Sequence, residues 1–336
     1  MNLSTEYLGL SLRNPVVASA GPLSQSVEGI KALADGGVGA VVVYSLFEEQ
    51  LRREAERVAE LEELYDDAFA EATSFFPSVP RVHDEPSHTY LKLIEQAAGA
   101  VDVPVIASLN GQSVGSWTAT ARQLEEAGAA ALELNIYFVP GDLHTSGTQV
   151  ERRHLEIVDA VKSSISIPVA VKLSPYFSSI GNMCLQLDQH GADGLVLFNR
   201  FLQPDVDIER LSVEAQVTLS SPAEAKLPRT WIAILRDKVR ASLAATTGVD
   251  TFEDVVKYIL AGADVVMTTS ALVRRGPAYA AVLVEGLERW LTAQQLPLEV
   301  ARGMLAVPKE TSATAYERAG YVSALQQAKS TYGSLS

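Results

Sequence analysis

Three polar residues of the sequence stand where short apolar runs end. Asn135 lies in ALELNIYFVPG, Lys172 in PVAVKLSP and Asn199 in GADGLVLFNR. Because a segment with helical periodicity follows each run, the runs are predicted to be strands of a parallel α/β fold. Ligand-binding and catalytic groups of such folds gather at the carboxyl ends of the strands. We therefore expect these three side chains to share one site.

Lys172 has the most specific chemistry of the three. A lysine that ends an interior strand must find an anionic partner or have its pKa lowered. Three interpretations are open: a cation for a bound anion, a Schiff-base nucleophile of a lyase, or a lysine that reaches solvent at the mouth of the fold. Asn135 and Asn199 then contact the same ligand, or they only stabilise loops.

Predicted strands and helices alternate along most of the chain, and the strands are continuous apolar runs, as expected when both faces of a sheet are buried. Helices are predicted at Val27–Ala34, Trp117–Glu126 and Phe252–Leu260, each followed closely by glycine. The predicted strands are Pro15–Ser19, Ala40–Tyr44, Val103–Ser108, Ala131–Ile136, Val169–Leu173, Gly194–Phe198, Ser242–Thr246 and Asp264–Thr268. This α/β pattern favours a (β/α)8 TIM barrel over a doubly wound sheet.

Several segments stand outside this alternation. Residues 3–15 alternate like a β-hairpin that would close the bottom of the barrel. Residues 47–72 are predicted to form a long acidic helix after the second strand, interpreted as a solvated face, a lid or a subunit interface. Residues 205–222 are a predicted insertion after the sixth strand. We expect one barrel domain over residues 1–310 and a C-terminal extension over residues 311–336.

The composition limits the partners that the protein can have. The formal net charge of −14 argues against nucleic acid and against an anionic membrane surface. A single cysteine, Cys184, excludes an internal disulfide framework and favours a cytoplasmic location. The N-terminus lacks the features of a signal peptide, and no apolar run approaches the roughly 20 residues of a membrane span.

In their order along the chain, several motifs resemble those of class 1 dihydroorotate dehydrogenases. They are LSTEYLGLSLRNPVVASAG, VIASLNGQSVGSW, ALELNIYFVPG, VAVKLSPYFSSI, GADGLVLFNR and GVDTFEDVVKYILAGADVV, within residues 3–306. The resemblance implies a TIM barrel that binds FMN at the carboxyl ends of its strands. It also implies a homodimer and the oxidation of dihydroorotate to orotate in pyrimidine biosynthesis.

The resemblance further implies roles for individual residues. Lys172 would lie beside the N1/C2=O edge of the flavin and stabilise negative charge on the reduced ring. Asn135 would face flavin and substrate, and Asn199 would hydrogen-bond the substrate. The other cofactor-binding residues implied in this way are Ala20, Gly21, Ser108, Thr247, Gly248, Thr269 and Ser270.

The chain departs from the family pattern at its catalytic loop. Phe138 stands where the family has its catalytic base, a cysteine or serine, and Pro140 replaces an asparagine that holds the substrate. Tyr44 replaces a lysine after the second strand. His144 is the candidate substitute base, because histidine titrates near neutral pH; Asp142 and Tyr137 are weaker candidates.

The phosphate-binding turns depart as well. Thr247-Gly248 and Thr269-Ser270 replace glycine-rich patterns, although hydroxyls and backbone N–H groups can still hold a phosphate. Besides a flavin-free lyase or aldolase that would use Lys172, two functions therefore stay open. One is an FMN-dependent oxidoreductase that oxidises dihydroorotate or another small anionic substrate by hydride transfer. The alternative is a catalytically silent barrel that acts as a binding or assembly module.

Other reactive residue types have simpler interpretations. His83 and His88 match no established metal-ligand spacing, so no metal site is predicted. Cys184 lies on the apolar side of a predicted helix and is assigned to the core. Arg274 and Arg275 either hold a phosphate or face solvent.

Overall fold

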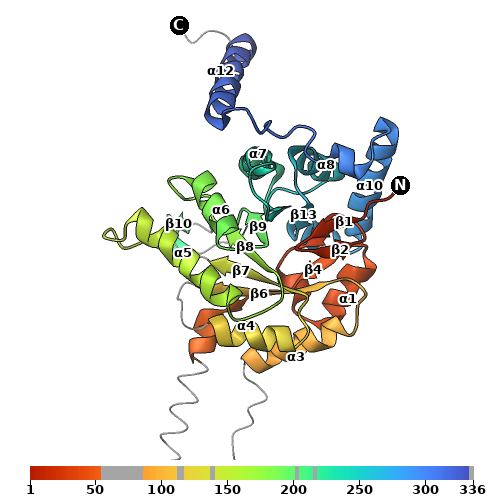
Figure 1. The fold of residues 1–336 in the computed structure, drawn as a ribbon, viewed down its shortest axis with the longest axis vertical. Coiled ribbons are helices and arrows are strands. Elements are labelled where there is room, and N and C mark those ends of the chain that lie inside the picture. Colours follow the sequence, from red (N-terminus) through yellow and green to blue (C-terminus); the bar gives the residue numbers. More distant parts are fainter. Residues whose placement is uncertain (54–85, 112–116, 137–140, 201–203, 215–217, 333–336) are drawn as a thin grey trace, which may run out of the picture.

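The computed structural model describes residues 1–53, 86–111, 117–136, 141–200, 204–214 and 218–332. Within them, parallel strands form a closed barrel with helices around its outside (Figure 1). The eight barrel strands are β3 (Val16–Ala18), β4 (Ala40–Val42), β6 (Val105–Gly111), β7 (Ala131–Ile136), β8 (Val169–Leu173), β9 (Gly194–Leu197), β12 (Ser242–Ala245) and β13 (Val265–Thr268). Pairing of β13 with β3 and of β4 with β6 closes the ring. The predicted TIM barrel is confirmed, and every strand overlaps its predicted range.

The strand side chains alternate between two apolar layers. Outward-facing residues pack against the helices in the larger core cluster. Inward-facing residues form a second cluster inside the barrel, which includes Val17, Val42, Ile106, Ala131, Ala170, Val196, Ala244 and Met267. The interior is therefore a packed core and not a pore.

An N-terminal hairpin closes one end of this interior. Strands β1 (Thr5–Tyr7) and β2 (Leu10–Leu12) pair antiparallel. Their residues Tyr7, Leu8 and Leu12 are buried in the same cluster as the inward-facing barrel residues. The hairpin predicted over residues 3–15 is thus confirmed.

Helices follow most of the strands and cover the barrel. The helix after β7 begins at a capping box, in which the Ser146 side chain accepts from the Gln149 N–H and the Gln149 side chain accepts from Ser146. The helices are α1 (Val27–Asp35), α3 (Pro86–Ala98), α4 (Trp117–Glu126), α5 (Gly147–Lys162), α6 (Ile180–Gln189), α7 (Lys226–Leu235), α8 (Phe252–Ala261), α9 (Ser270–Arg275), α10 (Tyr279–Gln294), α11 (Leu298–Ala301) and α12 (Ala313–Tyr332), with 3₁₀ turns η1 (Pro22–Ser24) and η3 (Pro222–Ala225).

The segments predicted to be added to the barrel lie partly within the described residues. Residues 48–53 are helical, and the rest of the predicted acidic helix lies outside the described residues. A short strand, β5 (Leu46–Phe47), precedes it and extends the pairing on β6. The insertion after β9 contains an antiparallel pair, β10 (Asp205–Asp207) and β11 (Ser212–Glu214). Figure 1 shows α12 standing apart from the barrel helices.

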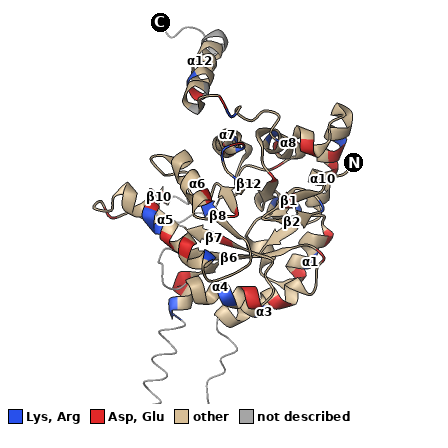
Figure 2. Ribbon diagram, viewed as in Figure 1, with Lys and Arg blue, Asp and Glu red and all other residues tan. Residues whose placement is uncertain are grey.

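Charged residues lie mainly on the helices and loops, while the barrel strands carry few of them (Figure 2). Glu133 on β7 and Lys172 on β8 are exceptions, because both are buried inside the barrel. No helix among the described residues is long and apolar enough to cross a membrane.

Candidate active site

Strand register brings polar side chains together at the carboxyl end of the barrel. Asn135 on β7 pairs with Lys172 on β8, and Ser108 on β6 pairs with Glu133 on β7. Glu133 and Asn135 lie two residues apart and therefore face the same side of the strand. All four residues are buried. The end of the interior away from the hairpin is thus polar.

Glu133 and Lys172 form a buried ion pair in this polar layer. The Lys172 Nζ donates to Glu133 Oε1 at 3.3 Å, and the two side chains are 9% and 1% exposed. The second carboxylate oxygen, Glu133 Oε2, is buried and has no hydrogen-bond partner among the described residues. The predicted anionic partner of Lys172 therefore includes a carboxylate of the protein itself.

Glu133 was missed by the sequence analysis. It lies inside the apolar run ALELNI, which was interpreted only as a strand. A signal was available, since acidic residues are rarely fully buried without a partner. Its spacing of two from Asn135 also places both residues on one face.

The structure brings Asn199 to the same layer. Its Nδ2 donates to Asn135 Oδ1 at 2.8 Å. The loop that carries Asn199 follows β9, and its backbone N–H donates to the Leu173 carbonyl at the end of β8. Asn135, Lys172 and Asn199, which the sequence places far apart, therefore lie together.

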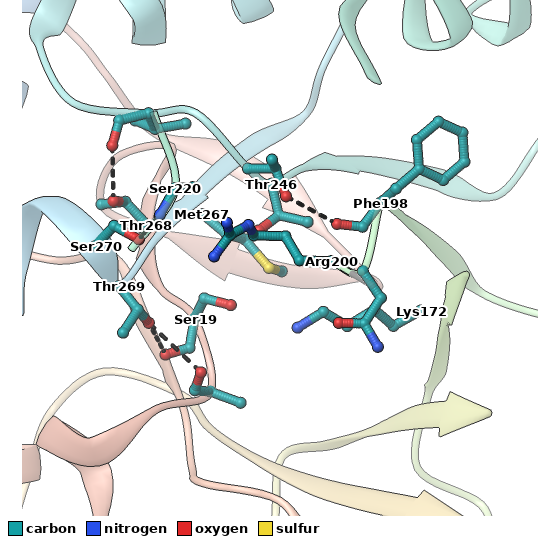
Figure 3. Close-up of a pocket in the computed structure, with 14 residues that line it drawn as sticks. Ser19, Lys172, Phe198, Arg200, Ser220, Thr246, Met267, Thr268, Thr269 and Ser270 are labelled. Carbon is teal, nitrogen blue, oxygen red and sulfur yellow. Dashed lines mark hydrogen bonds between the residues drawn. The ribbon is translucent and has the colours of Figure 1, made fainter. Parts of the chain in front are cut away.

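A pocket opens over this layer (Figure 3). Lys172 borders it on one side, while Ser220, Thr269 and Ser270 border it on the other. Six of the residues predicted to bind cofactor or substrate line the pocket: Ala20, Lys172, Asn199, Thr247, Thr269 and Ser270. They come from loops after five different strands, β3, β8, β9, β12 and β13, or from the strand ends.

Gly21 and Gly248 lie next to these lining residues, whereas Ser108 is buried and pairs with Glu133. Ser108 Oγ is 2.8 Å from Ser45 Oγ. A Cβ atom on Gly21 would lie 2.5 Å from the Thr269 methyl group, so only glycine allows this close approach. Gly248 has φ 74° and donates its N–H to Ser220 Oγ at 3.2 Å.

Hydroxyl groups and backbone N–H groups gather on the side of the pocket opposite Lys172. Ser270 Oγ accepts from the Ser220 N–H at 3.0 Å, and the two hydroxyl oxygens are also 3.0 Å apart. Thr269 Oγ1 donates to the Ser19 carbonyl, and Thr247 Oγ1 donates to the Phe198 carbonyl. Ser270 Oγ only accepts in these contacts, so its own O–H can be donated to an anion such as a phosphate. Ser220 was not among the predicted residues.

Arg200 also lines the pocket and was not predicted. Its Nε donates to Glu224 Oε1 at 3.0 Å, and its Nη1 donates to the Thr218 carbonyl. Partial burial acts to raise the pKa of Glu224, but hydrogen bonds from Ser221 and Arg200 hold that pKa below its ordinary value. Arg200 thus connects the pocket wall to η3 and to the segment before it.

The two arginines after β13 are paired with a carboxylate. Arg274 Nη1 lies 3.1 Å and Arg275 Nη2 lies 2.8 Å from Asp250, and neither arginine lines the pocket. The Arg275 hydrogen bond is the main cause that lowers the pKa of Asp250 below its ordinary value. Arg274 also donates to the Ser220 carbonyl, and the Arg275 guanidinium lies over the Tyr279 ring, 4.5 Å from its centroid.

Part of the predicted catalytic loop is described. Tyr137, Phe138 and Pro140 lie outside the described residues. His144 is exposed and does not line the pocket. Its backbone N–H donates to Asp142 Oδ1 at 3.0 Å.

Other residues singled out in the sequence do not line the pocket. Tyr44 packs edge to face on Tyr90, with ring centroids 5.0 Å apart. Cys184 is buried, and this burial raises the pKa of its thiol to about 12. His83 lies outside the described residues, and the part of the chain that is described contains no cluster suited to a metal ion.

Comparison with known proteins agrees with this geometry. The family model for dihydroorotate dehydrogenase matches residues 2–291. A dihydroorotate dehydrogenase B (NAD(+)) catalytic subunit from Listeria welshimeri is 30% identical over 272 residues, which are 79% of this chain and 85% of the relative. The corresponding subunit from Methanothermobacter thermautotrophicus is 26% identical, over 87% of this chain and 94% of the relative. A provisionally named dihydroorotate dehydrogenase A (fumarate) from Aeropyrum pernix is 29% identical, over 86% of this chain and 92% of the relative.

The matched region contains every barrel strand and every residue that lines the pocket. The chain belongs to the dihydroorotate dehydrogenase family.

Proposed function

We propose that the protein is an FMN-dependent oxidoreductase that takes a hydride from dihydroorotate or another small anionic substrate. The observation that carries the proposal is the position of Lys172, a buried cation that borders the pocket opposite a group of hydroxyl donors. A ligand with a phosphate at one end and an electron-accepting ring at the other is suited to such a pocket.

The residues present fit this cofactor. Thr247, Thr269 and Ser270 line the phosphate side of the pocket, and Gly248 adjoins it. Ser270 Oγ accepts in both of its hydrogen bonds and so keeps its own O–H to donate to a phosphate. When bound, FMN supplies the hydride acceptor. Lys172 then stabilises negative charge that develops on the acceptor, as a preorganised cation does at other oxyanion sites.

Asn135 and Asn199 orient the substrate in this proposal. The hydrogen bond between them uses one N–H of the Asn199 amide and one lone pair of the Asn135 amide oxygen. Each amide therefore has further donors and acceptors for a substrate. A substrate with amide and carboxylate groups, such as dihydroorotate, can use them. His144 stays the candidate for moving the substrate proton, and its exposed loop would have to bring it to the pocket.

The test is anaerobic addition of dihydroorotate to the FMN-loaded protein, followed by its visible spectrum. We expect the flavin absorbance to be lost and then restored by an acceptor, with fumarate and NAD(+) both assayed because relatives are named for them. Bound flavin that stays oxidised with dihydroorotate would contradict this substrate. A chain that binds no FMN would contradict the proposal as a whole and favour the silent barrel.

A homodimer and a cytoplasmic location stay predictions. Analytical ultracentrifugation and cell fractionation test them.

A further inference from the structure

The carboxylate of Glu133 has no role in the proposed function, yet it lies directly behind the residue on which that function depends. Glu133 is 1% exposed and does not line the pocket, whereas Lys172 does. The Lys172 ammonium therefore has the Glu133 carboxylate on its inner side, at 3.3 Å, and the pocket on its other side.

Among the described residues, Lys172 is the only ion-pair partner of Glu133. Glu133 Oε2 has no hydrogen-bond partner there. The nearby Tyr90 hydroxyl cannot serve as one, because it donates to the Ser108 carbonyl and accepts from the Ser108 N–H. The carboxylate is thus compensated by Lys172 and by little else.

The negative charge of Glu133 affects two buried tyrosines. Burial is the main cause that raises the pKa of Tyr7 and of Tyr90, and the charge of Glu133 raises both further. In such a buried region a unit charge interacts strongly over several ångströms, because the effective dielectric constant is well below that of water.

We propose that Glu133 is a positioning residue that acts through Lys172 to set the reduction potential of the bound flavin. This inference rests on the proposed function. Glu133 holds the Lys172 ammonium at the pocket and at the same time offsets part of its positive charge. The pocket therefore favours the reduced, more negative flavin less strongly than an unpaired lysine would.

The direction of the effect follows from the charges. Removing the carboxylate leaves the Lys172 charge uncompensated, so the reduced flavin should bind more tightly relative to the oxidised one. A change of about tenfold in that ratio corresponds to about 30 mV for a two-electron couple. The potential should rise in Glu133→Gln and fall in Lys172→Met.

The experiment measures the midpoint potential of bound FMN in the full-length protein by equilibration with reference dyes. The variants are Glu133→Gln, Lys172→Met, the double variant, and Glu133→Asp, which keeps the charge. Glu6→Gln is the matched control, because it removes one carboxylate from the exposed face of the hairpin at the opposite end of the barrel.

We expect a higher potential in Glu133→Gln and a potential near that of the unchanged protein in Glu133→Asp and Glu6→Gln. The difference between the double variant and Lys172→Met should be smaller than the rise from Glu133→Gln alone. An unchanged potential in Glu133→Gln would overturn the inference, as would a rise of the same size in the presence and in the absence of Lys172. If Glu133→Gln does not fold, Glu133→Leu makes the same test, because it also removes the charge; a potential no higher than that of the unchanged protein would overturn the inference. Absence of flavin from the unchanged protein would instead be a failure of the proposed function.

Discussion

The two ends of the barrel interior are built from the same strands and have opposite chemistry. Toward the amino ends, small and branched apolar side chains pack against Tyr7, Leu8 and Leu12 of the hairpin. Toward the carboxyl ends, a layer that includes Glu133 and Lys172 lies beneath an open pocket. Stability and ligand chemistry are thus assigned to different ends of one scaffold, as is usual in this fold.

Ion pairs show the same division. At the amino end, Asp264 accepts from Arg236 Nη1 at 2.7 Å and from the Leu243 N–H at 2.9 Å, so its charge is held by the frame of the barrel. At the carboxyl end, Lys172 has one carboxylate partner and borders the pocket. Only the second kind of pair leaves a charge available to a ligand.

The largest expected effect is a loss of stability from a substitution at the apolar end of the barrel. Leu12→Ala removes a side chain that is 1% exposed inside the barrel, and large-to-small changes at such sites cost about 2–5 kcal/mol. Chemical denaturation measures the loss of unfolding free energy. Because the change lies far from the pocket, the folded variant should keep its FMN affinity; a weakened affinity at equal folded fraction would mean that the two ends are coupled.

The next largest effect is a slower reduction of the flavin after a substitution at the polar end. Lys172→Ala removes the cation beside the pocket, and loss of one preorganised charge-stabilising group costs about 10²–10³-fold in rate. Anaerobic stopped-flow measurement of flavin reduction tests this. Lys162→Ala is the matched control. Lys162 Nζ lies 2.6 Å from Asp193 Oδ2, which also accepts from the N–H of Val169 at the amino end of β8. Equal rates in Lys172→Ala and the control would remove the assigned role.

Much of this division could be predicted from the sequence. The barrel strands are short apolar runs between helix-period segments, so their positions were found within a few residues. Asn135, Lys172 and Asn199 were recognised because polar residues at the ends of such runs share one edge in a parallel fold. The hairpin was recognised from its period of two.

The ion pair at the centre of the site could not be predicted in this way. The contact between Glu133 and Lys172 depends on the register of β7 on β8. An error of one residue in that register would place the Glu133 side chain on the opposite face of the sheet. Ser220 and Arg200 belong to irregular segments after β9, which have no periodicity to interpret. Their proximity to the pocket arises only from the closed barrel.

A smaller effect is expected at one of two glycines that have nearly the same φ angle and lie at opposite ends of the barrel. Gly248 at the pocket has φ 74° and Gly9 in the hairpin has φ 73°. Alanine in this left-handed region costs about 1–2 kcal/mol. A Cβ on Gly248 would also lie 2.8 Å from the Ala225 N and the Ser221 carbonyl oxygen, whereas one on Gly9 would meet nothing within 4 Å.

We therefore expect Gly248→Ala to weaken FMN binding by about tenfold, or 1.4 kcal/mol, and Gly9→Ala to leave it unchanged. Isothermal titration with FMN makes the measurement. Equal affinities in the two variants would show that this turn does not contribute to the phosphate side of the pocket.

The smallest effect is a pH dependence near the polar end. His154 on α5 is buried, its Nδ1 lies 2.8 Å from the Val150 carbonyl oxygen, and its ring packs edge to face on Phe177. Burial is the main cause that lowers its pKa below the ordinary value. The unfolded chain then binds a proton at a higher pH than the folded chain does.

Stability should consequently fall as pH decreases below about 6.5, the ordinary pKa of histidine, and level off below the lowered pKa. His154→Gln should reduce this slope, which thermal unfolding across the pH range measures. An identical slope in both proteins would assign the acid sensitivity to other groups.

In the proposed site, the polar end of the barrel holds FMN from two separate sides, with a cation at the ring and hydroxyls at the phosphate. Titration of the flavin-free protein with FMN and, in parallel, with riboflavin tests it most directly, because riboflavin lacks only the phosphate. We predict one FMN bound per chain and much weaker binding of riboflavin. Equal affinity for the two flavins, or no binding of either, would contradict the account.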